Sequence, residues 1–93
     1  MFNVIKELDS LKGKPCQWLF TSGESRIRFN GHIKAIEEDD LFYSVIVKFK
    51  GNKPMYVSLN KVLSMKKEEN EDMFKLHIFS NNVPVLVVGY LKA

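Results

Sequence analysis

Basic side chains alternate with apolar ones along residues 26–36, and they are the residues best suited to contact a ligand. Arg26, Arg28 and Lys34 fall on the polar side of this alternation, so a strand would place them on one face. Arginine and lysine on such a face neutralise nucleic-acid phosphates with little dependence on base sequence. A solvated strand face, balanced by acids in nearby loops, is the alternative interpretation, and the sequence leaves both open.

Further basic and polar residues extend this candidate interface. Tyr56 lies on the polar side of a shorter alternating run, which predicts an exposed ring on which a base could stack. More often, an aromatic side chain of this kind packs in a core or at a sheet edge. The full set of candidate nucleic-acid-binding residues is Arg26, Arg28, Lys34, Lys48, Lys50, Tyr56, Asn60 and Lys61.

No arrangement of residues in the sequence indicates catalysis. His32 and His77 are far apart, and neither has a neighbouring nucleophile and carboxylate in a triad-like order. The carboxylates cluster in runs 37–40 and 68–72, which we expect to be solvated, whereas acid–base pairs need burial to separate their pKa values. One cysteine and two histidines give no zinc-ligand spacing. We therefore expect a non-catalytic protein without a cofactor or metal.

The composition is that of a globular protein. The chain has 93 residues, 45% of them hydrophobic and 27% charged, which fits one domain over residues 1–93. The net charge of +3 favours a nucleic-acid partner only slightly. Cys16 has no second cysteine to pair with, and no apolar run approaches the roughly 18–20 residues of a membrane span. Since MFNVIKELDS is no secretory signal, we expect a cytoplasmic protein that contacts no membrane.

The hydrophobic pattern predicts a mainly β fold. Helical spacing of apolar residues indicates a short helix over 2–12, which Gly13 and Pro15 end. From 16 to 65, apolar residues recur at every second position between tight turns, which predicts five antiparallel strands. We expect these strands over 16–21, 26–36, 41–50, 55–59 and 62–65.

The five strands are expected to close into a small, strongly bent antiparallel β-barrel. Gly31, in the middle of the second strand, predicts the bend that such a barrel needs. Residues 66–72 are expected to form a polar loop. An additional C-terminal hairpin over 73–91 is expected to pair 73–79 with 83–91.

This order of elements resembles that of Sm-like domains. The resemblance to bacterial Hfq and other Sm-like barrels covers residues 2–65 and is carried by FNVIKELDSLKGKP, FNGHIKAI and MYVSLNKVLSM. The NGHIKAI and YVSLNKVLSM segments are also similar to the C-terminal part of YolD-like proteins. The resemblance implies an Sm-like or SH3-like barrel that binds RNA. Where Hfq-type members carry a Tyr-Lys-His signature for uridine-rich RNA, this chain has Leu59, Asn60 and Lys61, so the polar, basic pair Asn60–Lys61 remains.

An apolar run near the end of the chain keeps a second function class open. Residues 83–88 are hydrophobic at every position, which requires cover on both faces of the strand. A second copy of the chain would supply this cover most simply, so we expect a homo-oligomer with Val85, Leu86, Val87 and Val88 in its interface. The alternative to a module that binds RNA or DNA is therefore a protein-interaction module, such as a small accessory or inhibitor protein of a bacterium, phage or mobile element.

Overall fold

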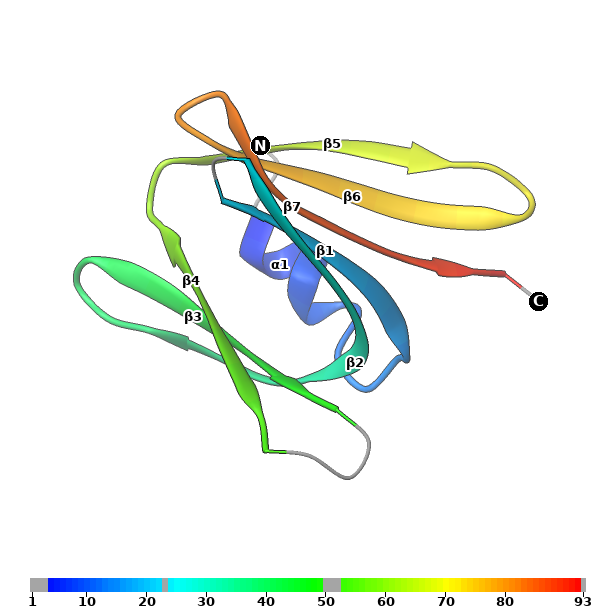
Figure 1. Cartoon of the computed structure of the whole chain (residues 1–93), viewed down its shortest axis with the longest axis horizontal. Coiled ribbons are helices and arrows are strands. Elements are labelled where there is room, and N and C mark those ends of the chain that lie inside the picture. Colours follow the sequence, from blue (N-terminus) through cyan, green and yellow to red (C-terminus); the bar gives the residue numbers. More distant parts are fainter. Residues whose placement is uncertain (1–3, 23, 50–52, 93) are drawn as a thin grey trace.

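The computed structural model describes residues 4–22, 24–49 and 53–92, and within these ranges the chain forms one short helix and seven strands (Figure 1). The strands form one antiparallel sheet in the order β4-β3-β2-β1-β7-β6-β5. The mainly β prediction is thus confirmed. The elements are α1 (Val4–Asp9), β1 (Cys16–Ser22), β2 (Ser25–Glu38), β3 (Phe42–Lys48), β4 (Met55–Asn60), β5 (Leu63–Glu69), β6 (Met73–Ser80) and β7 (Val83–Leu91).

The long strand β2 joins two parts of the sheet, because it changes its partner next to Gly31. Residues 25–31 pair with β1 and, with β7, β6 and β5, form the large part; residues 32–38 pair with β3 and, with β4, form the small part. A Cβ atom at Gly31 would lie 2.8 Å from the carbonyl oxygen of Lys48, so glycine allows β3 to approach this closely. The sequence predicted a bend at Gly31, and here β2 passes from one part of the sheet to the other (Figure 1).

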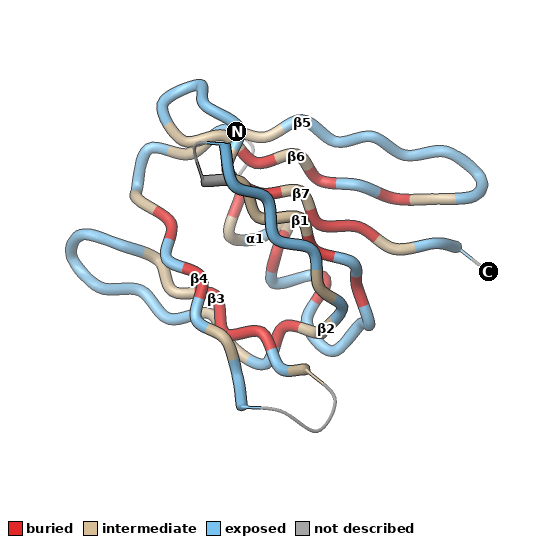
Figure 2. The backbone as a smooth tube through the Cα atoms, viewed as in Figure 1, coloured by how far each residue is buried: buried red, intermediate tan, exposed pale blue. Residues whose placement is uncertain are grey.

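The core lies on the inner face of the sheet, which is the face turned toward α1. Leu8 of the helix packs there with Trp18, Leu76 and Val88, which share one row across β1, β7 and β6. Buried residues alternate with less buried ones along β6 (Figure 2). The Trp18 indole Nε1 donates a 3.1 Å hydrogen bond to the carbonyl oxygen of Gly31, so the core also holds the bend of β2.

The sheet does not close, so the predicted barrel is not confirmed. Strands β4 and β5 are its two edges. A barrel made of residues 16–65 alone would need β5 to pair with another of its own five strands. Instead β5 pairs with β6, and the hairpin formed by β6 and β7 lies between β1 and β5. The predicted pairing within 73–91 is confirmed, but this hairpin is an integral part of the sheet and not an addition to it.

Strand β5 extends further than the sequence predicted. Residues 66–69, assigned above to a polar loop, continue the strand and pair with β6. An edge strand has solvent on one side, and charged side chains there are compatible with strand structure. The connection to β6 is a short turn in which the Asn70 side-chain oxygen Oδ1 accepts hydrogen bonds from the backbone N–H groups of Asp72 (2.7 Å) and Met73 (3.0 Å).

The apolar run in β7 is covered in part by the rest of the chain. Strand β7 lies between β1 and β6, and its residues Leu86 and Val88 are 1% and 0% exposed in the core. Val85 is half-buried and packs against this core, whereas Val87 is half-buried on the outer face. Part of the apolar run is thus covered by the chain itself, whereas Val83 at its start is 58% exposed. The homo-oligomer stays a prediction.

Gly89 of β7 is required by packing. A Cβ atom there would lie 2.4 Å from the backbone oxygen of Phe74, so we expect Gly89→Ala to lower the free energy of unfolding by about 2 kcal/mol or more. Gly13→Ala is the control: the φ of Gly13 is +83°, no heavy atom of the described residues lies within 4 Å of its Cβ position, and backbone strain alone should cost about 1 kcal/mol. Urea denaturation measures both losses, and equal losses would contradict the packing role.

The two faces of β7 should respond differently to a carboxylate. We expect Val88→Asp to unfold the protein, because an unpaired charge in the core costs about 4 kcal/mol or more. Val87→Asp should leave the protein folded with a loss below about 2 kcal/mol, because this side chain reaches solvent. Circular dichroism during thermal melting distinguishes the two. Unfolding of both variants to the same extent would show that the outer face is as tightly packed as the core.

Candidate nucleic-acid interface

The outer face of the large part of the sheet brings basic residues from distant segments together. Directly opposed residues in neighbouring strands point to the same face of a sheet. The register therefore places one row of side chains across β2, β1, β7, β6 and β5, and the row reads Arg28, Leu19, Val87, His77 and Lys66. A half-buried centre is thus flanked by an exposed cation at each end.

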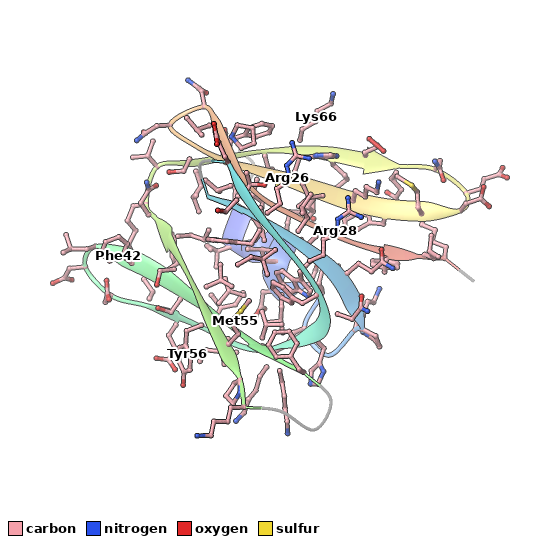
Figure 3. The ribbon with its side chains drawn as sticks, in the orientation of Figure 1. Arg26, Arg28, Phe42, Met55, Tyr56 and Lys66 are labelled. Atoms are coloured by element: carbon pink, nitrogen blue, oxygen red, sulfur yellow. The ribbon has the colours of Figure 1, made fainter. Side chains whose placement is uncertain are left out.

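The adjoining rows add two more cations to this face. Arg26 lies opposite Thr21 in the row on one side, and Lys75 lies opposite Gly89 in the row on the other. Figure 3 shows Arg26, Arg28 and Lys66 over the same part of the molecule, well apart from Tyr56. We call Arg26, Arg28, Lys66 and Lys75 the outer basic face.

None of these four cations forms an ion pair with another residue that the structure describes. Glu68 also lies on this face, opposite Lys75, but its carboxylate is 3.6 Å from the imidazole of His77. Several acids are paired with lysines elsewhere, and the pairs are Lys12–Asp9, Lys61–Glu38, Lys67–Glu7 and Lys92–Glu69. The face therefore carries an excess of positive charge, with four cations and the carboxylate of Glu68.

A groove of about 410 Å³ opens at Gly89, beside these cations. Gly89 presents no side chain in the middle of the outer face, between Gln17 of β1 and Lys75 of β6. Polar and apolar groups both contribute to the wall. The groove is lined by Gln17, Trp18, Leu19, Arg28, Phe29, Asn30, Met73, Phe74, Lys75, Val87, Gly89, Tyr90 and Leu91.

Four of the other predicted interface residues belong to the small part of the sheet, namely Lys34, Lys48, Tyr56 and Asn60. Lys34 is exposed at the register shift of β2, and Lys48 lies opposite His32. Tyr56 is 63% exposed on the edge strand β4, opposite Ile46. These residues lie beyond the bend of β2 from the outer basic face. Lys50 lies outside the described residues.

Asn60 and Lys61 are engaged in contacts within the chain. The Asn60 amide nitrogen donates a hydrogen bond to the Ser80 hydroxyl, and its side-chain oxygen accepts one from the backbone N–H of Val62 at 3.0 Å. The Lys61 ammonium lies 2.5 Å from the Glu38 carboxylate, and this hydrogen bond raises the pKa of the lysine. The same ammonium lies 4.2 Å from the centre of the Tyr43 ring. Both side chains therefore support the connection between β4 and β5.

Sequence reasoning missed four residues of the outer face. Lys66 was assigned to a loop, and Lys75, Gln17 and Asn30 were not singled out. Alternation along β6 would have placed Lys75 on a polar face, but it gives no information on which strand lies next to β6. Lys66 and Lys75 become neighbours of the arginines only through the pairing of β7 with β1. Asn30 lies in the same strand as the arginines, and Gln17 lies directly opposite Asn30 in the paired strand β1.

Cys16 is a core residue at the start of β1. Burial is the main cause that raises the pKa of its thiol, which disfavours the reactive thiolate. Within the ranges that the structure describes, no three side chains of the His, Cys, Asp and Glu types are placed to hold a metal ion. The one helix in these ranges is too short to span a membrane.

Comparisons with known proteins do not assign the chain to a family. No family model matches the sequence, and no match is found among curated proteins or solved structures.

The contacts of Lys61 predict a structural role that can be separated from binding. We expect Lys61→Ala to lower stability at neutral pH but to change oligonucleotide affinity less than twofold. The pKa of this lysine is raised above its ordinary 10.5, so its contribution is present below that pH and is lost as the pH rises through the raised value. Urea denaturation at pH 7 and fluorescence anisotropy measure the two quantities. A large loss of affinity with unchanged stability would instead place Lys61 in the interface.

Proposed function

We propose that this protein is a non-catalytic module that binds RNA, and that its outer basic face contacts the phosphates. The observation that carries the proposal is the gathering of Arg26, Arg28, Lys66 and Lys75 on one sheet face without acidic partners among the described residues. Most of the favourable free energy of such binding comes from the release of counterions when cations meet phosphates.

The arginines are well suited to this role. Arg26 and Arg28 are two residues apart in one strand, so their Cα atoms are about 6.6 Å apart. This distance is comparable to the spacing of successive phosphates along a nucleic-acid strand. A guanidinium group binds a phosphate through two parallel hydrogen bonds, which a lysine cannot do.

Binding of this kind should be sensitive to salt and only weakly selective for sequence. Each phosphate contact with a single strand contributes about −0.7 to the slope of log affinity against log salt concentration. The cations supply no fixed pattern of donors and acceptors for base edges. We therefore expect RNA of mixed sequence to be an adequate probe.

Reversal of the arginine charges tests the proposal. We expect Arg26→Glu/Arg28→Glu to reduce RNA affinity by more than about a hundredfold, because two attractive contacts become repulsive. Folding should be preserved, since both side chains are exposed. Fluorescence anisotropy with a labelled RNA at two salt concentrations measures affinity and slope, and circular dichroism verifies the fold.

A control variant with the same change in net charge separates local contacts from overall charge. Lys12→Glu/Lys92→Glu replaces two lysines that are paired with Asp9 and Glu69 and are not among the four residues of the outer basic face. We expect this control to retain most of the affinity of the wild-type protein. Equal losses in the two double variants, or wild-type affinity in the arginine variant, would contradict the assignment of the outer basic face.

A second candidate function is protein binding, and it is favoured by the outer face of the small part of the sheet. Ile46 is 6% exposed but lies outside the core cluster, between Ala35 and the exposed Tyr56. An exposed aromatic beside an apolar contact is common in protein interfaces. A protein complex that does not respond to salt and is lost in Tyr56→Ser would support this function.

A further inference from the structure

The groove at Gly89 lies between two cations of the outer basic face. Arg28 lines it from β2 and Lys75 from β6, with β1 and β7 between them. A nucleic-acid strand that contacts both cations must therefore pass over the groove. Its volume of about 410 Å³ falls within the range of about 300–1,000 Å³ that is typical of small-ligand sites.

The groove wall has the chemistry that a planar, polar-edged ring needs. Leu19 and Val87 supply half-buried apolar surface, and the buried backbone of Gly89 forms part of the same wall. Gln17 and Asn30 lie directly opposite each other on the outer face, and both are exposed. Within the described part of the chain, no hydrogen bond engages either amide. Each amide offers both a donor and an acceptor.

We propose that the nucleic acid bound by this face is single-stranded, and that one unstacked base occupies the groove at Gly89. This inference rests on the function proposed above and adds that the bound nucleic acid is single-stranded. In a duplex the bases are stacked and paired inside the helix, whereas an unpaired base can be turned outward and bonded along its edge. Apolar wall atoms contact the ring, Gln17 and Asn30 bond its edge, and Arg28 and Lys75 hold the phosphates on either side.

Three labelled probes of about 12 nucleotides, a length typical of single-strand sites, test this inference. The first is a mixed-sequence single strand, the second is the same strand in a duplex, and the third is an abasic strand with the same sugars and phosphates. All three are DNA, because abasic DNA is chemically stable, and RNA of the first sequence is measured beside them. Fluorescence anisotropy at one moderate salt concentration gives the affinities.

We expect the single strand to bind about tenfold more tightly than the abasic strand, because the seated base adds hydrogen bonds and apolar contact. The duplex should also bind more weakly than the single strand. In Gln17→Ala/Asn30→Ala, the advantage over the abasic strand should fall to about threefold or less, while the affinity for the abasic strand stays unchanged. Ser58→Ala, which removes a polar group from the exposed surface of β4, is the matched control and should leave all affinities as in the wild-type protein.

The outcomes separate this inference from the proposed function. Equal affinity for the base-bearing and abasic strands, with the arginine variant still defective, would show that the face binds phosphates only and would overturn the seating of a base. Tighter binding of the duplex would overturn the single-stranded ligand. If neither RNA nor any DNA probe binds at low salt, both proposals fail, and a protein partner becomes the better interpretation of the groove. Equal urea midpoints of the wild-type protein and Gln17→Ala/Asn30→Ala would show that the variant loses selectivity without losing stability.

Discussion

The close approach of β2 and β3 at Gly31 is the constraint on which the rest of the structure depends. A side chain at this position would overlap the backbone of Lys48, so the strand could not leave β1 and continue against β3 at the same distance. The Trp18 indole fixes the carbonyl of Gly31 from the core side. One strand thereby serves both parts of the sheet, and the turn of the chain at this point encloses the core and α1.

The arrangement of charge follows from this enclosure. The inner face is occupied by the core, so polar residues of the central strands must lie on the outer face or at the edges. Acidic residues near the sheet edges and in the helix form ion pairs with lysines, for example Glu7 with Lys67 and Glu69 with Lys92. The cations of the outer basic face have no such partners among the described residues. This separation gives a chain of net charge +3 one distinctly basic surface.

Local patterns in the sequence were sufficient to predict the elements but not their neighbours. The sequence predicted the pairing of 73–79 with 83–91, and Gly31 marked the change of direction in β2. Residues 66–69 were predicted to be a loop because they are charged and show no apolar alternation. An exposed edge strand can carry such charged side chains. The order β1-β7-β6-β5 arises from pairing between distant segments, which a period of two cannot encode. For the same reason Arg26 and Arg28 were found from the sequence, while Lys66 and Lys75 were not.

Gly89 has a packing role that must be kept apart from any role in binding. The backbone oxygen of Phe74 would lie 2.4 Å from a side-chain carbon at this position, so the fold alone requires glycine there. Glycine at this position is therefore explained by packing and is not itself an argument for a ligand. Gln17 and Asn30 instead support the seating of a base, because these two exposed amides without partners among the described residues line the groove in the same row as Gly89 and Lys75.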